Sequence, residues 1–118
     1  MNGYDTLQRQ RRRTVSATVE VVDTMTDAVV GHLGNLSENG MLLIANSPLA
    51  DDALYQLRFN LFQASDRSRA LEVGAHLLWQ DGARVPGHTW IGLRFITVLD
   101  HQLQQLREWL DPPIGQHP

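Results

Sequence analysis

The residues with the clearest binding chemistry are the arginines of QRQRRRT, residues 8–14. This segment contains four of the ten arginines, Arg9, Arg11, Arg12 and Arg13. An arginine side chain presents a planar fork of N–H donors that pairs bidentately with phosphate and stacks on aromatic bases. The chain has no lysine, so all of its basic side chains have this geometry. The block can be a solvated tail, an arm that binds nucleic acid, or one half of a specific anion site.

The distribution of charge separates these possibilities. Residues 1–13 have four arginines against one acid, a net charge of +3, whereas the other 105 residues have six arginines against twelve acids, a net charge of −6. Proteins that bind long polyanions usually have a basic face on the folded body. Positive charge confined to one short arm therefore favours a small anionic ligand and argues against a nucleic acid polymer as partner.

A second polar segment, NLSENG at residues 35–40, has side chains that can complete such a site. The amide of Asn35 can meet the polar edge of a base, and the Ser37 hydroxyl can donate to a phosphate or a carbonyl. Asn39 and Gly40 tolerate positive φ, which would let the backbone turn sharply and present N–H groups to an anion. The plain alternative is that the segment only joins two strands.

Residues suited to enzymatic chemistry are missing or scattered. The absence of cysteine excludes a disulfide, a thiolate zinc site and a cysteine nucleophile. The five histidines have no HExxH-like or other close ligand spacing, and neither a glycine-rich phosphate loop nor a GxSxG elbow occurs. We therefore predict that the protein is not an enzyme and that it uses no metal and no cofactor.

The elements that must position these residues follow from hydrophobic periodicity. Apolar residues at every second position predict strands at 15–21, 55–61, 71–79 and 89–95, and the segments AVVGHLGNL and GMLLIA predict two more at 28–36 and 40–45. We expect a turn at 23–27, a loop at 46–52, a turn or loop at 63–68 and a break in pairing at 80–87. Trp79 keeps the parity of the apolar residues before it, which predicts packing in the core or at its rim, with base stacking as the alternative.

The end of the chain has helical periodicity instead. One apolar helix face is formed by Leu99, Leu103, Leu106 and Leu110. Thr97 and Asp100 have the spacing of a capping box, and Pro112 and Pro113 end the helix. Six short strands and one amphipathic helix predict a mainly β fold, a small antiparallel barrel or sandwich with the helix over one opening or face. A barrel is favoured because it leaves no exposed sheet edge.

We expect one domain, in which residues 1–13 form a flexible arginine-rich arm. Residues 14–111 form the barrel and its helix, and residues 112–118 are a proline-containing tail. No apolar run approaches the roughly 20 residues needed to cross a bilayer, and no signal-peptide stretch adjoins the arginines. These observations predict a cytoplasmic protein without membrane insertion.

An antiparallel hairpin around residues 23–27 brings the two polar segments together. Pairing about that centre places residue 22 opposite 28, and residue 14 opposite 36. The arginine block precedes the first strand and NLSENG follows the second. The two segments are therefore expected to meet at one end of the barrel.

The combined pattern resembles the PilZ domain, a bacterial receptor module for cyclic di-GMP. Arg9 and Arg13 form an RxxxR pair, and Asn35, Ser37 and Gly40 form a [D/N]xSxxG motif. AHLLW at 75–79 and IGLRF at 91–95 resemble the fifth and sixth strands of that family, so the similarity runs from about residue 8 to residue 110. The resemblance implies a six-stranded antiparallel barrel of the split-barrel type with a C-terminal helix.

The resemblance also implies how the ligand would be bound. Arg9 and Arg13 would hold the phosphates and guanines, and Asn35 would contact a guanine edge or hold the arginines in place. Ser37 would hydrogen-bond the ligand, and Gly40 would permit the backbone geometry of the turn. Arg11, Arg12, Asn39 and Trp79 are further candidate ligand contacts.

Two departures from the family pattern affect affinity and stoichiometry. The family often has aspartate at the position of Asn35 and glycine at the position of Asn39. Gln8 occupies a position where some relatives have another arginine, so either one or two ligand molecules per chain are compatible with the sequence.

The function implied is that of a second-messenger receptor that acts as an adaptor. Ligand binding would order the arginine arm, and the new surface would signal to an effector protein whose identity and pathway the sequence does not specify. We expect a monomer or a weak dimer. Two alternatives are a small β-barrel that binds RNA or single-stranded DNA through the arm, and a PilZ-like protein-interaction scaffold without ligand.

Overall fold

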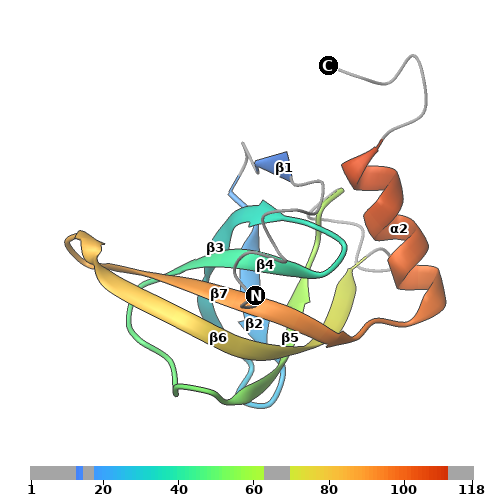
Figure 1. The fold of residues 1–118 in the computed structure, drawn as a ribbon. Coiled ribbons are helices and arrows are strands. Elements are labelled where there is room, and N and C mark those ends of the chain that lie inside the picture. Colours follow the sequence, from blue (N-terminus) through green and yellow to red (C-terminus); the bar gives the residue numbers. More distant parts are fainter. Residues whose placement is uncertain (1–12, 15–17, 63–69, 112–118) are drawn as a thin grey trace.

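The computed structural model describes residues 13–14, 18–62 and 70–111 of the chain. Seven strands and one helix are formed by these residues (Figure 1). Their bounds are β1 Arg13–Thr14, β2 Glu20–Asp23, β3 Ala28–Leu36, β4 Gly40–Ala45, β5 Leu54–Phe59, β6 Leu71–Val85, β7 His88–Thr97 and α2 Asp100–Leu110.

The strands form a closed antiparallel barrel. Along the sheet the order is β1-β3-β2-β5-β6-β7-β4, and β4 pairs back onto β3. Six strands, β2 to β7, therefore close the barrel, and β1 is an additional short strand paired with β3. The predicted six-stranded barrel with a C-terminal helix is confirmed. Closure leaves no free edge between β3 and β4, which is the reason a barrel was favoured over an open meander.

Two predicted strands, 28–36 and 40–45, have the same bounds in the structure as β3 and β4. The predicted strand 55–61 begins and ends slightly earlier, as β5. In place of the predicted strand 15–21, the structure has β1 and β2, and residues 15–17 lie outside the described residues. The predicted turn at 63–68 also lies outside them.

The predicted break at 80–87 is wrong. β6 continues to Val85 and turns directly into β7, with Gly87 at φ 81° in the tight turn. Register shifts interrupt the β6–β7 ladder between Leu77 and Trp79, and again between Asp81 and Val85. Such bulges add unpaired residues, so the period-2 pattern disappears although pairing continues.

The barrel interior is apolar and tightly filled. The largest fully buried side chains belong to Val21, Leu33, Leu36, Met41, Leu43, Leu57, Leu71, Val73, Leu77, Ile91, Leu93 and Leu106. All but the last lie on the strands, and Leu106 comes from α2. Burying one such side chain contributes about 1.5–3 kcal/mol, so this cluster is the main source of stability.

Helix α2 follows β7 and packs against the same core through Leu106 and Leu110. Its N-cap is Leu99, with φ −68° and ψ 151°, and no side chain caps the first turn. The predicted capping box is therefore wrong, because Thr97 still belongs to β7, where it pairs with Gly74. Leu99 is 55% exposed, and Gln102 is the buried residue of the first turn instead.

Candidate functional site

The predicted meeting of the two polar segments occurs, with the register displaced by one residue. Thr14 pairs with Asn35 and Arg13 with Leu36, where the hairpin geometry had placed residue 14 opposite 36. The displacement arises because the ladder is interrupted. Glu20 pairs with His32, so six steps from Glu20 to Thr14 span only three steps along β3. The pairing nevertheless brings the end of the arm alongside the start of NLSENG.

Arg13 is the one arginine of the 9–13 block that the described residues include. Arg9, Arg11 and Arg12 lie outside them, so their predicted roles stay predictions. Arg13 is half-buried, and its guanidinium carbon lies 4.1 Å from the centroid of the Trp109 ring. Its Nη1 atom also donates a hydrogen bond to the backbone carbonyl of Trp109. The end of α2 thus holds a predicted ligand-binding arginine.

Trp109 was not predicted as a site residue. It is partly buried and packs against the core. The contact joins residues 96 positions apart, and no local pattern in the sequence marks it. It follows only once the register of β1 and the docking of α2 are both known.

Ser37 organises the turn between β3 and β4. The residue is fully buried, and its backbone N–H donates to the Gly40 carbonyl at 2.9 Å. Its Oγ lies 3.4 Å from the same carbonyl and accepts a hydrogen bond from the Asn39 N–H at 3.3 Å. The hydroxyl therefore fixes the turn that carries Glu38 and Asn39.

The predicted positive φ at Asn39 and Gly40 is wrong. Among the described residues, positive φ occurs at Asp27, Asp52 and Gly87. Gly40 is instead the first residue of β4, where it pairs with Arg94, and the Asn39 carbonyl accepts a 2.7 Å hydrogen bond from Phe95. Both residues bond or pair with β7 without adopting positive φ, so no left-handed nest forms there.

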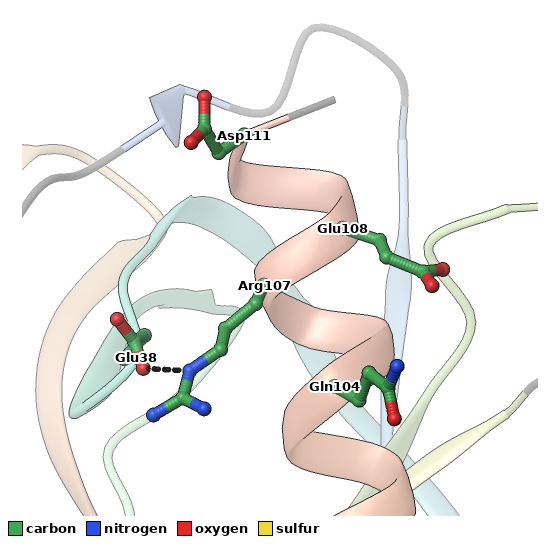
Figure 2. A pocket seen from close by; sticks show the side chains of 5 residues that line it. All are labelled: Glu38, Gln104, Arg107, Glu108 and Asp111. Atoms are coloured by element: carbon green, nitrogen blue, oxygen red, sulfur yellow. Dashed lines mark hydrogen bonds and ion pairs between the residues drawn. The ribbon is translucent and has the colours of Figure 1, made fainter. Parts of the chain in front are cut away.

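Glu38, in the same turn, contacts α2. The Nε of Arg107 donates to Glu38 Oε1 at 2.6 Å, and both side chains remain partly exposed. Figure 2 shows this pair among the side chains that line an open pocket: Glu38, Gln104, Arg107, Glu108 and Asp111. The pocket has a volume of about 510 Å³. The last two turns of the helix are therefore joined to both polar segments, through Trp109 and through Arg107.

Asn35 lies on the outer face of the barrel. It pairs with Leu42, which is half-buried between the inward-facing Met41 and Leu43. Arg13 lies opposite Leu36, whose side chain is fully buried, and directly paired residues share a face of the sheet. Arg13 therefore lies on the face toward the core and α2, whereas Asn35 lies on the opposite face.

Trp79 lies on the same outer face as Asn35. The pairs Asn35–Leu42, Leu42–Gly92 and Gly92–Trp79 form one continuous row across β3, β4, β7 and β6. The parity that predicted a core or rim position for Trp79 is changed by the bulge after Leu77. The indole lies against Gly92, where an added Cβ would come within 2.2 Å of its Nε1 atom.

The described residues show neither a metal site nor a membrane-spanning helix. Across residues 13–14, 18–62 and 70–111, no group of three or more histidine, aspartate or glutamate side chains is arranged to hold a metal ion. No helix formed by these residues has both the length and the apolar character needed to cross a membrane.

A closed six-stranded barrel with two polar segments joined at one end defines a small β-barrel domain. The family model of the PilZ domain matches residues 7–111, and this chain belongs to that family. The resemblance predicted from the motifs is thereby confirmed.

Solved structures support the same fold. A structure of the Bacillus subtilis inhibitor of motility, MotI/DgrA, matches with a TM-score of 0.68 and 13% identity, covering 86% of this chain and 48% of that one. The Escherichia coli protein YcgR in complex with c-di-GMP matches with a TM-score of 0.65 and 17% identity, covering 85% and 42% respectively.

The PilZ domain of E. coli YcgR with c-di-GMP also matches, with a TM-score of 0.65 and 18% identity, covering 86% of this chain and 87% of that one. This chain thus spans about half the length of the first two proteins and nearly the whole of the isolated domain. No curated protein matches it by sequence.

Proposed function

We propose that this protein is a receptor for cyclic di-GMP, which it binds where the arginine arm meets the outer face of the barrel. The observation that carries the proposal is the β1–β3 pairing, which places Arg13 and Asn35 one register step apart. Membership of the PilZ family supports the ligand class, and so do the structures of YcgR with c-di-GMP.

The chemistry of the site suits two phosphates flanked by guanine bases. Arg9 and Arg13 supply guanidinium forks for the phosphates, and such charge-assisted bonds are about twice as strong as neutral ones. The Asn35 amide both accepts and donates, so it can pair with the N–H groups and the O6 or N7 acceptors of guanine.

Trp79 supplies a stacking surface in the same row. Its indole lies against Gly92, two strand spacings or roughly 10 Å from β3. One nucleotide can bridge that separation. A guanine held by Asn35 at one edge can therefore belong to the same ligand as a base or ribose that packs on Trp79.

The proposed output is a change in the arm and in what it presents. Ordering a residue costs about 1–2 kcal/mol, so the arm must gain strong phosphate contacts to fold onto the barrel. The ordered arm and the ligand then form a surface for an effector protein. The protein acts by binding and performs no chemistry of its own in this scheme.

Calorimetric titration with cyclic di-GMP tests the proposal. We expect saturable binding at micromolar ligand that is lost in Arg13→Ala. The control is Arg58→Ala, which should bind cyclic di-GMP as wild type does. Arg58 pairs at 3.5 Å with Asp27, which directly precedes β3 and so lies at the other end of that strand from Asn35. Cyclic di-AMP, with the same phosphates and a different base, should bind more weakly.

The same titration distinguishes the rival functions. Absence of heat with micromolar cyclic di-GMP contradicts the proposal and leaves a protein-interaction scaffold. Binding to an oligonucleotide with a steep salt dependence, and no preference for cyclic di-GMP, indicates a nucleic-acid-binding barrel instead. The molar ratio at saturation gives one or two ligands per chain.

A further inference from the structure

The end of helix α2 holds the arginine that the proposed ligand needs. Arg107 and Trp109 lie two residues apart in the last turns of the helix, and each contacts one of the two polar segments. Arg107 pairs with Glu38 (Figure 2), and Trp109 binds Arg13. The helix is thus connected to the site through both halves of the proposed binding motif.

Arg13 serves as a cap for α2. The last carbonyls of a helix have no partner within it, and the negative end of the helix dipole attracts a cation. The Asp111 N–H satisfies the Arg107 carbonyl at 2.9 Å, and Arg13 satisfies the Trp109 carbonyl. Stacking of the same guanidinium on the indole adds a cation–π attraction.

These contacts use the part of Arg13 that a nucleotide would use. One face of the guanidinium lies over Trp109, and one terminal nitrogen donates to the helix. Arg13 also lies on the core-side face of the sheet, whereas Asn35 and Trp79 lie on its outer face. Arg13 cannot stay stacked on Trp109 and join Asn35 around one ligand.

We propose that Trp109 is a positioning residue that holds Arg13 on α2, so that cyclic di-GMP and the docked end of the helix compete for one guanidinium. This proposal rests on the proposed function. Ligand binding withdraws Arg13 from Trp109, and the helix end loses both its cap and its cation–π contact. The signal then reaches the partner through the last turn of α2 as well as through the arm.

A graded series at position 109 tests the competition. Leucine keeps apolar bulk against the core but has no ring, and phenylalanine has a ring that attracts a cation less than indole does. We expect Trp109→Leu to bind cyclic di-GMP about 5–150-fold more tightly than wild type, the usual range of coupling between two sites. The affinity of Trp109→Phe for cyclic di-GMP should lie between those of wild type and Trp109→Leu.

The matched control is Gln104→Ala. Gln104 is exposed near the middle of α2 and lines the pocket with Arg107, but it is neither the residue that stacks on Arg13 nor the one that pairs with Glu38. The affinity of Gln104→Ala for cyclic di-GMP should equal that of wild type. Thermal unfolding of each variant verifies that changes in affinity are measured on folded protein.

Hydrogen exchange distinguishes this role from a purely structural one, because a structural tryptophan would not make the exchange rate at the helix end depend on ligand. In wild type, saturating cyclic di-GMP should speed exchange of the amides of residues 109–111, and Trp109→Leu should show fast exchange with or without ligand. Equal affinities across the 109 series, or exchange slowed by ligand at these amides, overturn the competition and leave the receptor function standing. If no variant binds, both proposals fall together.

Discussion

The indole of Trp79 lies against Gly92 on the neighbouring strand, so close that a Cβ at position 92 would be 2.2 Å from the indole Nε1 and 2.3 Å from Cε2. Glycine is required at this position because of the tryptophan. The contact also turns Trp79 along the outer face of the barrel, in the row that includes Asn35.

Gly92→Ala is therefore expected to displace Trp79. Overpacking of this kind costs about 1–3 kcal/mol of unfolding free energy, and the ring must leave the row as well. Urea unfolding measures the first effect and tryptophan fluorescence the second. The control is Gly82→Ala in β6, where the nearest atom to an added Cβ is 3.7 Å away. Equal stability of the two variants would contradict this packing.

The strand bounds that could be predicted from the sequence are those that turn-forming residues mark at both ends. β3 and β4 are bounded by turn-forming residues, so their bounds agree with the prediction, although a register shift between Leu33 and Asn35 interrupts the ladder of β3. The full length of β6 could not be predicted, because the bulge after Leu77 leaves no mark in residue type. The same bulge moved Trp79 from the predicted core or rim position to the outer face.

The site could be predicted in part, and the missing part depends on long-range contacts. The convergence of Arg13 with Asn35 follows from one hairpin, which local turn chemistry indicates. The contact of Arg13 with Trp109 depends on how α2 docks after the whole barrel has closed. Glu38 likewise looked like a turn residue, and only the placement of Arg107 gives it a partner.

Ser37 contributes to stability through the turn between β3 and β4. Its buried hydroxyl accepts from Asn39, and alanine would leave that N–H without this partner. We expect Ser37→Ala to lower the unfolding free energy by about 1–2 kcal/mol. Thermal or urea unfolding measures this loss, and Ser47→Ala in the exposed loop after β4 should change stability by less than about 0.5 kcal/mol. Unchanged stability of Ser37→Ala would contradict this role of the hydroxyl in the turn.

Two leucines of the predicted apolar helix face should differ sharply in their effects. Leu106 is 1% exposed within the core, whereas Leu99 is 55% exposed at the N-cap. Truncation of a buried leucine to alanine costs about 2–5 kcal/mol, so Leu106→Ala should destabilise the barrel strongly. Leu99→Ala should cost less than about 1 kcal/mol because it removes little buried area. If chemical denaturation shows similar losses of unfolding free energy for both variants, Leu99 is packed like Leu106, as the sequence predicted.

Asn35→Asp tests whether the outer face binds a guanine edge. A carboxylate accepts from the guanine N1–H and N2–H groups more strongly than a neutral amide does, and its charge lies on the face opposite Arg13. We expect cyclic di-GMP affinity to rise on the order of 10-fold, since charge-assisted hydrogen bonds are worth about 1.5–3 kcal/mol against 0.5–1.5 for neutral ones.

The same charge placed elsewhere separates recognition from net charge. Asn46→Asp adds one acid in the exposed loop after β4 and should leave affinity unchanged or slightly lower it, because the ligand is an anion. If Asn35→Asp lowers the affinity for cyclic di-GMP instead of raising it, the residue at position 35 faces a phosphate and not a guanine edge. The gain must also be smaller for cyclic di-AMP, because adenine has no N1–H or N2–H donors to offer the carboxylate. Calorimetric titration of both ligands against both variants resolves these outcomes.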